Sequence, residues 1–169
     1  MKKLIAVIIS AFALVTATYA AESEFDTNAW SLTIAGSGTT TTQTASTSFG
    51  ADVGLSYSGF AGLPTQLETG VRQGFGYSSE GEVMVGRTAL AADWNIQVYK
   101  KLYVFAGAEA AVKYGNTSPV WTAGPEAGVK YFVKKDVYLL GQVNYDFNLT
   151  DSDQSDAMRY LVGFGIRFK

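Results

Sequence analysis

The last eleven residues of the chain, from Arg159 to Lys169, alternate without interruption along an extended backbone. One face would carry Tyr160, Val162, Phe164, Ile166 and Phe168. The opposite face would carry Arg159, Leu161, Gly163, Gly165 and Arg167. Because successive side chains of a strand point to opposite sides, this pattern predicts a membrane-crossing β-strand with lipid on one face and a polar interior on the other.

Seven further segments show the same period-two alternation. They are Ala29–Ser37, Thr47–Tyr57, Gln66–Tyr77, Val83–Ile96, Leu102–Tyr114, Trp121–Val133 and Val137–Leu149. Each is about as long as a tilted membrane strand, and the total number of strands is even. The sequence therefore predicts an all-β fold, an eight-stranded antiparallel up-and-down transmembrane β-barrel with a polar, charge-paired lumen. Pro125 falls inside one of these strands, where its missing N–H predicts a bulge or local break near Gly124.

Aromatic residues on the expected lipid face fall into two groups. If both chain ends are periplasmic, the periplasmic group is Trp30, Tyr57, Trp94, Tyr131 and Phe168. The outer group is then Phe49, Tyr77, Tyr114, Trp121, Phe147 and Tyr160. Two such girdles suit the two membrane interfaces, where amphipathic rings settle at headgroup depth. The alternative is a soluble barrel, which would hold these rings in its core and place residues such as Glu68 and Glu109 on its surface.

The first residues have the pattern of a secretory signal. Lys2 and Lys3 precede an apolar run, and Thr18-Tyr19-Ala20 offers small residues three before and one before a cut after Ala20. We therefore expect a signal peptide over residues 1–20 and a single barrel domain over residues 21–169. An uncleaved helical anchor is the alternative, but the apolar run is short for one.

Composition excludes several classes of function. Of 13 basic and 15 acidic residues, 11 and 15 remain after cleavage, so the net charge is −4 and nucleic acid is not an expected partner. The chain has no cysteine, which removes disulfides and thiolate metal sites, and no histidine, which removes a Ser-His-Asp triad. We expect neither a cofactor nor a metal site and predict that the protein is not an enzyme.

Charged residues concentrate on the inward face. The predicted lumen network comprises Asp52, Glu68, Arg72, Arg87, Asp93, Glu109, Lys113, Glu126, Lys130, Asp146, Arg159 and Arg167. An eight-stranded barrel is only wide enough for side chains to fill it, so these six acids and six bases should pair across the lumen. Gln142, Asn144 and Asn148 are expected to complete the hydrogen bonding. The inward glycines could line a pore, but packing space opposite long side chains is the favoured interpretation.

Two acidic patterns could carry chemistry instead. Glu109 and Glu126 are candidates for an acid–base pair, but each is followed by a lysine four residues later and a structural ion-pair role is favoured. Asp151-x-Asp153-x-x-Asp156 offers carboxylates for a hard cation, but it lacks the turn glycine and the bidentate glutamate of an EF-hand loop. The acidic sequence is therefore interpreted as a solvated loop.

The expected connections differ in charge. Those on the periplasmic side carry Lys100, Lys101, Lys134 and Lys135, whereas those on the outer side hold Glu80, Glu82, Asp151, Asp153 and Asp156. All are short, so none offers a long external binding loop.

Three segments give the chain a family resemblance. They run from Trp30 to Gly38, from Glu68 to Gln73 and from Pro125 to Phe132. With them the mature chain resembles the small outer-membrane β-barrel family related to OmpX and the OmpA transmembrane domain. The resemblance implies insertion by the outer-membrane assembly machinery, which reads an aromatic-ended last strand, here Phe164, Ile166 and Phe168. This chain differs by one residue, because Lys169 follows Phe168.

Taken together, these features favour a non-enzymatic protein of the outer membrane of a Gram-negative-type bacterium, monomeric and surrounded by membrane lipid. Its role would be structural or one of surface interaction, with a lumen plugged by side chains and an external ligand unknown. A narrow channel for ions or small solutes is the alternative. An outer-membrane lipid-modifying enzyme is a third hypothesis from a different class.

Overall fold

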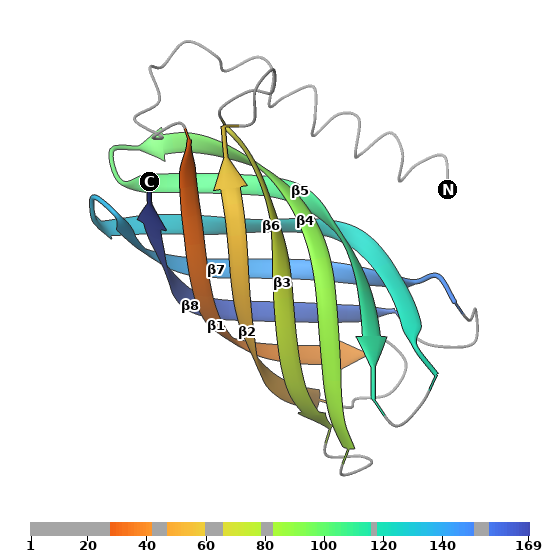
Figure 1. Cartoon of the computed structure of the whole chain (residues 1–169). Helices are drawn as coiled ribbons and strands as arrows, with labels where there is room; N and C mark the ends of the chain where they lie inside the picture. The colour runs from red at the N-terminus through yellow and green to blue at the C-terminus, as the bar shows by residue number, and fades with distance from the viewer. Residues whose placement is uncertain (1–27, 42–46, 60–65, 79–82, 116–117, 151–155) are drawn as a thin grey trace.

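The computed structural model describes residues 28–41, 47–59, 66–78, 83–115, 118–150 and 156–169 (Figure 1). The expected signal peptide and the acidic residues Glu80, Glu82, Asp151 and Asp153 lie outside these residues. Among the described residues, no helix is long and apolar enough to cross a membrane.

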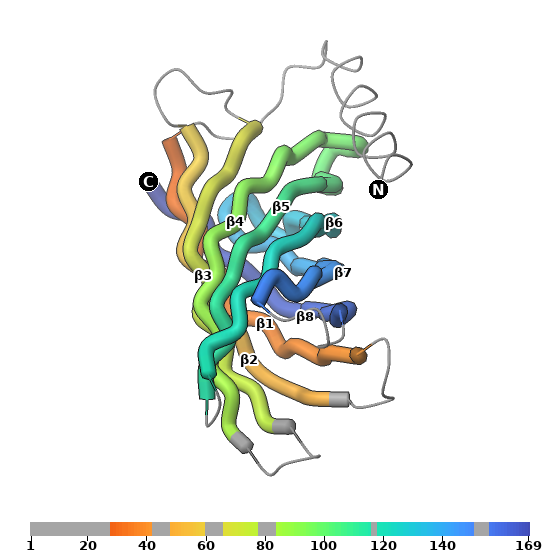
Figure 2. Tube along the Cα trace, turned by 90° about the vertical axis from the view of Figure 1, so that its right-hand side faces the viewer, coloured from red at the N-terminus to blue at the C-terminus, as the bar shows by residue number. Residues whose placement is uncertain are grey.

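Eight antiparallel strands close into one barrel in the order β1 to β8, as the sequence predicts. The strands are β1 (Ala29–Thr41), β2 (Thr47–Ser58), β3 (Leu67–Ser78), β4 (Val83–Tyr99), β5 (Leu102–Tyr114), β6 (Val120–Lys134), β7 (Val137–Asn148) and β8 (Ala157–Phe168). Each pairs with its neighbours in the chain, and β1 closes the barrel by pairing with β8, beside which it lies in Figure 2. We call the end that holds Ala29 and Phe168 the proximal end and the opposite end the distal end.

The strand limits differ from the expected ones by more than two residues in two places. β1 continues to Thr41 rather than ending at Ser37, because Thr39 and Thr40 pair with both β2 and β8. β4 continues to Tyr99 rather than Ile96, across a shift in register between Gln97 and Tyr99. In both places the backbone pairing continues beyond the alternating apolar residues, because backbone hydrogen bonds between strands do not require an alternating side-chain pattern.

Pro125 interrupts one ladder without shifting it. β6 pairs with β7 up to Ala123 opposite Phe147 and resumes at Glu126 opposite Asn144, with the same register on both sides. The expected disturbance is therefore a local break and not a bulge. A Cβ at Gly124 would overlap the carbonyl oxygen of Tyr145, so the two backbones approach too closely here for any other residue.

The apolar face of each strand forms the outside of the barrel. Val162 is 74% exposed and Phe49 is 72% exposed, whereas Glu68 and Glu109 are 5% and 4% exposed. The soluble-barrel alternative is wrong, because it requires the reverse arrangement. An apolar outer surface around a charged interior is the arrangement of a membrane barrel.

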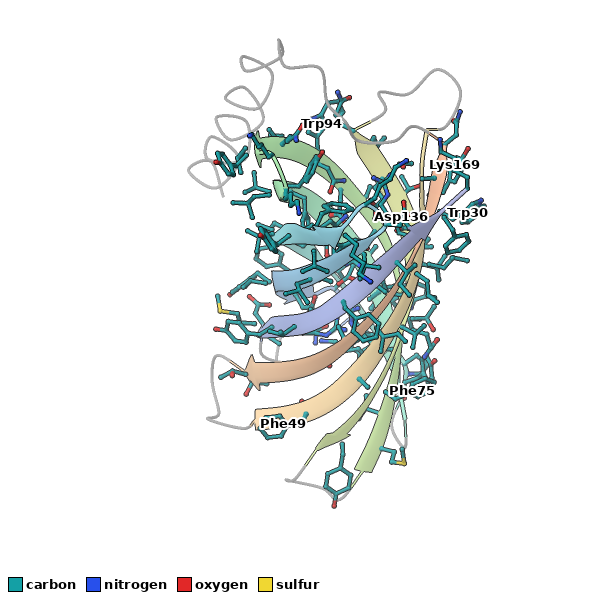
Figure 3. The ribbon with its side chains drawn as sticks, turned by 90° about the vertical axis from the view of Figure 1, so that its left-hand side faces the viewer. Trp30, Phe49, Phe75, Trp94, Asp136 and Lys169 are labelled. Atoms are coloured by element: carbon teal, nitrogen blue, oxygen red, sulfur yellow. The ribbon has the colours of Figure 1, made fainter. Side chains whose placement is uncertain are left out.

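Aromatic side chains on this outer surface lie toward both ends. At the proximal end Trp30 is opposite Tyr57 on one side and Phe168 on the other, and the Trp30 and Tyr57 rings are 4.9 Å apart. At the distal end Phe49 is opposite Tyr77. Figure 3 shows Trp30 and Trp94 toward one end and Phe49 toward the other.

The other members of the two expected girdles also lie on outward-facing positions. Exposed rings are Tyr77, Tyr114, Trp121, Tyr131, Tyr160 and Phe168, and half-buried rings are Tyr57, Trp94 and Phe147. On β8 the residues expected to direct assembly, Phe164, Ile166 and Phe168, are all exposed on this face.

Candidate functional site: the barrel lumen

The lumen contains a charged layer at mid-height. Its members are Asp52, Glu68, Arg72, Arg87, Asp93, Glu109, Lys113, Glu126, Lys130, Asp146 and Arg159. They come from seven strands, and each occupies an inward position of the alternation. Some of the ion pairs, such as Arg72–Asp93, join neighbouring strands, whereas Arg72–Glu126 and Lys130–Glu68 connect β3 with β6 across the interior.

Arg72 on β3 is the centre of this layer. Its guanidinium donates to Asp93 at 2.9 Å, to Glu109 at 3.0 Å and to Glu126 at 2.5 Å. The Arg72 side chain is 16% exposed, and the three carboxylates are exposed by 5% or less. Three buried carboxylates therefore accept hydrogen bonds from one planar guanidinium, whose several N–H donors can serve more than one carboxylate at once.

Two further arginines complete the layer on the distal side. Arg87 pairs with Glu109 and, at 3.4 Å, with Asp146. Arg159 pairs with Asp52 and lies 3.8 Å from Glu109. Glu109 thus contacts three arginines, Arg72, Arg87 and Arg159.

Side-chain amides and a lysine join the layer as well. Asn144 donates to Glu109 at 2.9 Å and to Glu126 at 2.8 Å, and Gln142 donates to Glu126 at 2.7 Å. Lys113 pairs with Asp146 at 2.9 Å. The Asn148 side-chain oxygen accepts from the Thr150 N–H at 2.9 Å.

Lys130 connects the charged layer to a second layer on the proximal side. Its ammonium lies 3.0 Å from Glu68 and 3.0 Å from the side-chain oxygen of Asn95. The same nitrogen lies 5.0 Å from the centre of the Phe105 ring and 5.6 Å from that of Tyr138. Such cation–π contacts stabilise a cation that has left bulk water.

The second layer is an aromatic cluster that sequence reasoning missed. It consists of Tyr103, Phe105, Phe132, Tyr138 and Leu140, all buried. The Phe132 ring centre lies 5.3 Å from that of Tyr103 and 5.2 Å from that of Tyr138. Strand parity was the signal that could have found it, because each of these residues occupies an inward position between outward residues such as Val104 and Leu139.

Arg167, the remaining expected member of the network, lies closer to the proximal end. It donates to the Ser58 hydroxyl at 2.9 Å. Ser58 in turn donates to the carbonyl oxygen of Ala29 at 3.3 Å. These contacts join β8, β2 and β1 where the barrel closes.

The inward glycines provide packing space. An added Cβ at Gly74 would come within 2.6 Å of the Asp52 carboxylate, and one at Gly54 within 3.3 Å of the Arg72 side chain. At Gly165 it would overlap the Tyr138 ring. The long side chains of both layers therefore occupy the volume that these glycines leave empty.

Cavities occur at three heights of the lumen. One of about 30 Å³ lies between the layers, lined by Arg72, Phe105 and Tyr138 among others. A distal cavity of about 300 Å³ and a proximal one of about 970 Å³ lie on either side. The cavity of about 30 Å³ is large enough to admit a water molecule.

Among the described residues, no group of three or more His, Cys, Asp or Glu side chains is placed to hold a metal ion. Asp156, the one described member of the acidic loop sequence, lies 3.3 Å from the Tyr145 hydroxyl and accepts the Asn148 N–H at 3.2 Å.

Solved structures of similar shape include several small membrane barrels. Neisserial surface protein A superposes with a TM-score of 0.61 at 12% identity, over 83% of this chain and 96% of that protein. The N-terminal β-barrel domain of Pseudomonas aeruginosa OprF gives 0.56 at 19% identity, over 84% and 98%. The chain has the fold of the small eight-stranded outer-membrane barrels. The attachment invasion locus protein Ail of Yersinia pestis gives 0.53 at 12% identity, over 85% and 100%.

No protein-family model and no curated protein sequence matches the chain. At these identities the structural likeness establishes the fold, and function has to be argued from the lumen and the surface.

Proposed function

We propose that the chain is an integral outer-membrane protein that acts without catalysis, in a structural or surface-interaction role. The exposed apolar wall between two groups of aromatic rings supports its placement in lipid, since an apolar band flanked by aromatic girdles matches a bilayer. The secretory pattern of residues 1–20 supports export. In this placement the proximal end faces the periplasm and the distal end faces outward.

The observation that carries the proposal is the pair of buried side-chain layers in the lumen, which we propose close it. The charged layer crosses the barrel from Arg72 on β3 to Glu126 on β6, and the aromatic cluster of β5, β6 and β7 lies on its proximal side. Opening a path for ions would require moving arginines that each contact two or more carboxylates, and buried ion pairs are costly to break. A closed barrel can act only through its surfaces and connections.

The chemistry of the lumen also supports a non-catalytic role. The chain has no histidine to serve as a general base. The buried carboxylates that could replace it contact arginines, and their positions are set by those contacts. We propose further that the protein is a monomer whose partners are membrane lipids and, during insertion, the assembly machinery that reads the last strand.

Epitope insertion tests the placement and orientation. An epitope inserted between Asp153 and Gln154 should be detected by antibody on intact cells, and one appended after Lys169 only after the outer membrane is permeabilised. The reverse result would contradict the orientation, and recovery of both tagged proteins in the soluble fraction would contradict membrane placement.

A separate experiment tests for enzymatic activity. Incubation of the refolded chain with labelled phospholipid or lipopolysaccharide should release no product, and turnover would restore the enzyme hypothesis.

The two end cavities favour a narrow channel as a second candidate function. They measure about 300 and 970 Å³ and face each other across the two layers. A channel would need both layers to rearrange together, whereas the closed barrel needs no motion. Single-channel conductance distinguishes the two functions, because only the channel would carry a current.

A further inference from the structure

The distal cavity of about 300 Å³ lies on the outer side of the charged layer. Glycines make room for it, because Gly50 on β2 lies opposite Gly76 on β3 and both occupy inward positions. Asp52 lies opposite Gly74 one inward pair deeper, so the wall next to the Asp52 carboxylate carries little side-chain volume. A cavity of this size is at the lower limit of those that hold small ligands.

The floor of the distal cavity has more hydrogen-bond donors than acceptors left over. Nε of Arg87 and Nη1 of Arg159 have no hydrogen-bond partner among the described residues, and both residues are buried and line the cavity. Of the lining carboxylates, Asp146 has Oδ2 2.9 Å from the Lys113 ammonium, whereas Oδ2 of Asp52 has no described partner. Because arginine and lysine only donate, a ligand for this floor must supply acceptors.

Lys113 reaches the cavity from β5 and is the most accessible of its cations. Its side chain is 25% exposed, whereas those of Arg87 and Arg159 are 8% and 4% exposed. An ammonium has three N–H donors, so its contact with Asp146 leaves two for a ligand. A carboxylate is the acceptor that such charged donors bind most strongly.

Hydroxyl groups line the walls of the distal cavity. Ser37 and Thr39 on β1 and Ser48 on β2 belong to its lining, and Thr39 lies opposite Ser48. Thr122 lines it from β6, which is opposite β2 in the strand order, and its buried hydroxyl has no hydrogen-bond partner among the described residues. Because hydroxyl groups both donate and accept, these walls suit a ligand that carries hydroxyl groups of its own.

We propose that the distal cavity binds a small hydroxylated carboxylate of the size of a sugar acid. Its carboxylate would lie toward Lys113, Arg87 and Arg159, and its hydroxyl groups toward the serine and threonine walls. Buried donors without partners are costly, and the ligand would remove part of that cost. A source outside the cell rests on the proposed function, which turns the distal end outward, whereas binding itself depends only on the barrel.

Ligand titration of the refolded mature chain in detergent micelles tests this proposal. The probe is D-glucuronate, followed by the NMR amide signals of Gly76 and Thr122. Saturable shifts should give a dissociation constant in the millimolar range, as expected for a ligand of this size. D-Glucose, which has the same ring without the carboxylate, should bind about tenfold more weakly. Equal affinity for methyl β-D-glucuronide would support an acid at the end of a glycan, and weaker affinity would support the free acid.

Two variants locate the site. Lys113→Met should weaken glucuronate binding about tenfold and change glucose binding less than about twofold, because only the carboxylate needs the ammonium. Gly76→Leu should abolish binding of both sugars, because its added Cβ would meet no atom closer than 3.5 Å and the rest of the side chain would fill the cavity. The matched control is Gly36→Leu on the exposed lipid face, where the added Cβ would meet one atom at 3.9 Å and both affinities should stay unchanged.

The absence of saturable shifts in a chain that shows the heat-dependent gel shift would overturn the proposal. Acetate binding as tightly as glucuronate would also overturn it, because the site would then hold an adventitious ion only. Unchanged glucuronate affinity in Gly76→Leu would do the same. If Gly76→Leu does not fold, Lys113→Met decides, because its partly exposed side chain should be replaceable without loss of the fold. The epitope experiment tests the proposed orientation separately, so the two proposals can fail independently.

Discussion

Replacing Arg72 by Met should destabilise the barrel more than any other single change in the lumen. The substitution keeps an unbranched side chain of similar length but removes the cation that contacts Asp93, Glu109 and Glu126. Glu109 retains Arg87, and Glu126 retains the amide donors of Gln142 and Asn144. Asp93 loses the ion-pair partner that it has in the charged layer.

Removing one partner of a buried ion pair costs about 3–5 kcal/mol, because the remaining charge stays buried without compensation. Arg72 is 16% exposed on its side chain and its partners 5% or less, so little of this cost should be relieved by water. We therefore expect a loss of about 3–5 kcal/mol in the free energy of unfolding. Adding Glu126→Gln should recover part of it, with a coupling of about 0.5–3 kcal/mol.

Urea unfolding in lipid vesicles measures this loss, followed by tryptophan fluorescence and by the heat-dependent gel shift of folded barrels. Lys113→Met is the matched control, because its partner Asp146 retains Arg87 and its own side chain is 25% exposed. The control should lose about 1 kcal/mol or less. Equal losses for the two variants, or a loss below about 1 kcal/mol for Arg72→Met, would refute the central role of Arg72.

Three other changes test the wall, the strand contacts and the assembly signal. Gly124→Ala should lower the free energy of unfolding in urea by about 1–3 kcal/mol, because the added Cβ would overlap the Tyr145 carbonyl. Gly141→Ala is the control: its added Cβ would meet one atom at 3.6 Å, so the free energy of unfolding should change by less than about 0.5 kcal/mol. Val162→Arg on the exposed mid-wall should cost about 2–4 kcal/mol in vesicles, and a cost below about 0.5 kcal/mol, as for an ordinary surface substitution, would argue against lipid contact. Phe168→Ala should slow insertion into membranes that contain the assembly machinery while leaving spontaneous folding into pure lipid vesicles little changed, and equal slowing in both would indicate a stability effect instead.

Much of the fold follows from alternation alone. The side on which Glu109 or Val162 lies is fixed by strand parity, and the even number of strands follows from counting alternating segments. The closed barrel confirms the predicted number of strands. Alternation could not locate the ends of β1 and β4, because Thr39 and Gln97 carry no apolar signal and backbone pairing alone extends those strands.

The partners within the lumen could not be predicted in the same way. Which acid meets Arg72 depends on the stagger of neighbouring strands around the barrel, and this stagger is a property of all eight strands together. The aromatic cluster was missed for a different reason. Tyr103, Phe132 and Tyr138 occupy inward positions, but the abundance of inward charges suggested a lumen that is polar throughout.

Single-channel recording tests the proposed closure of the lumen most directly. The mature chain, refolded and shown by its heat-dependent gel shift to be folded, would be inserted into a planar bilayer. The account predicts no current steps for the unmodified chain, because the charged layer and the aromatic cluster close the lumen in series. Discrete and reproducible current steps that change in size when Arg72, Arg87, Glu109 or Arg159 is replaced would contradict it and establish the channel.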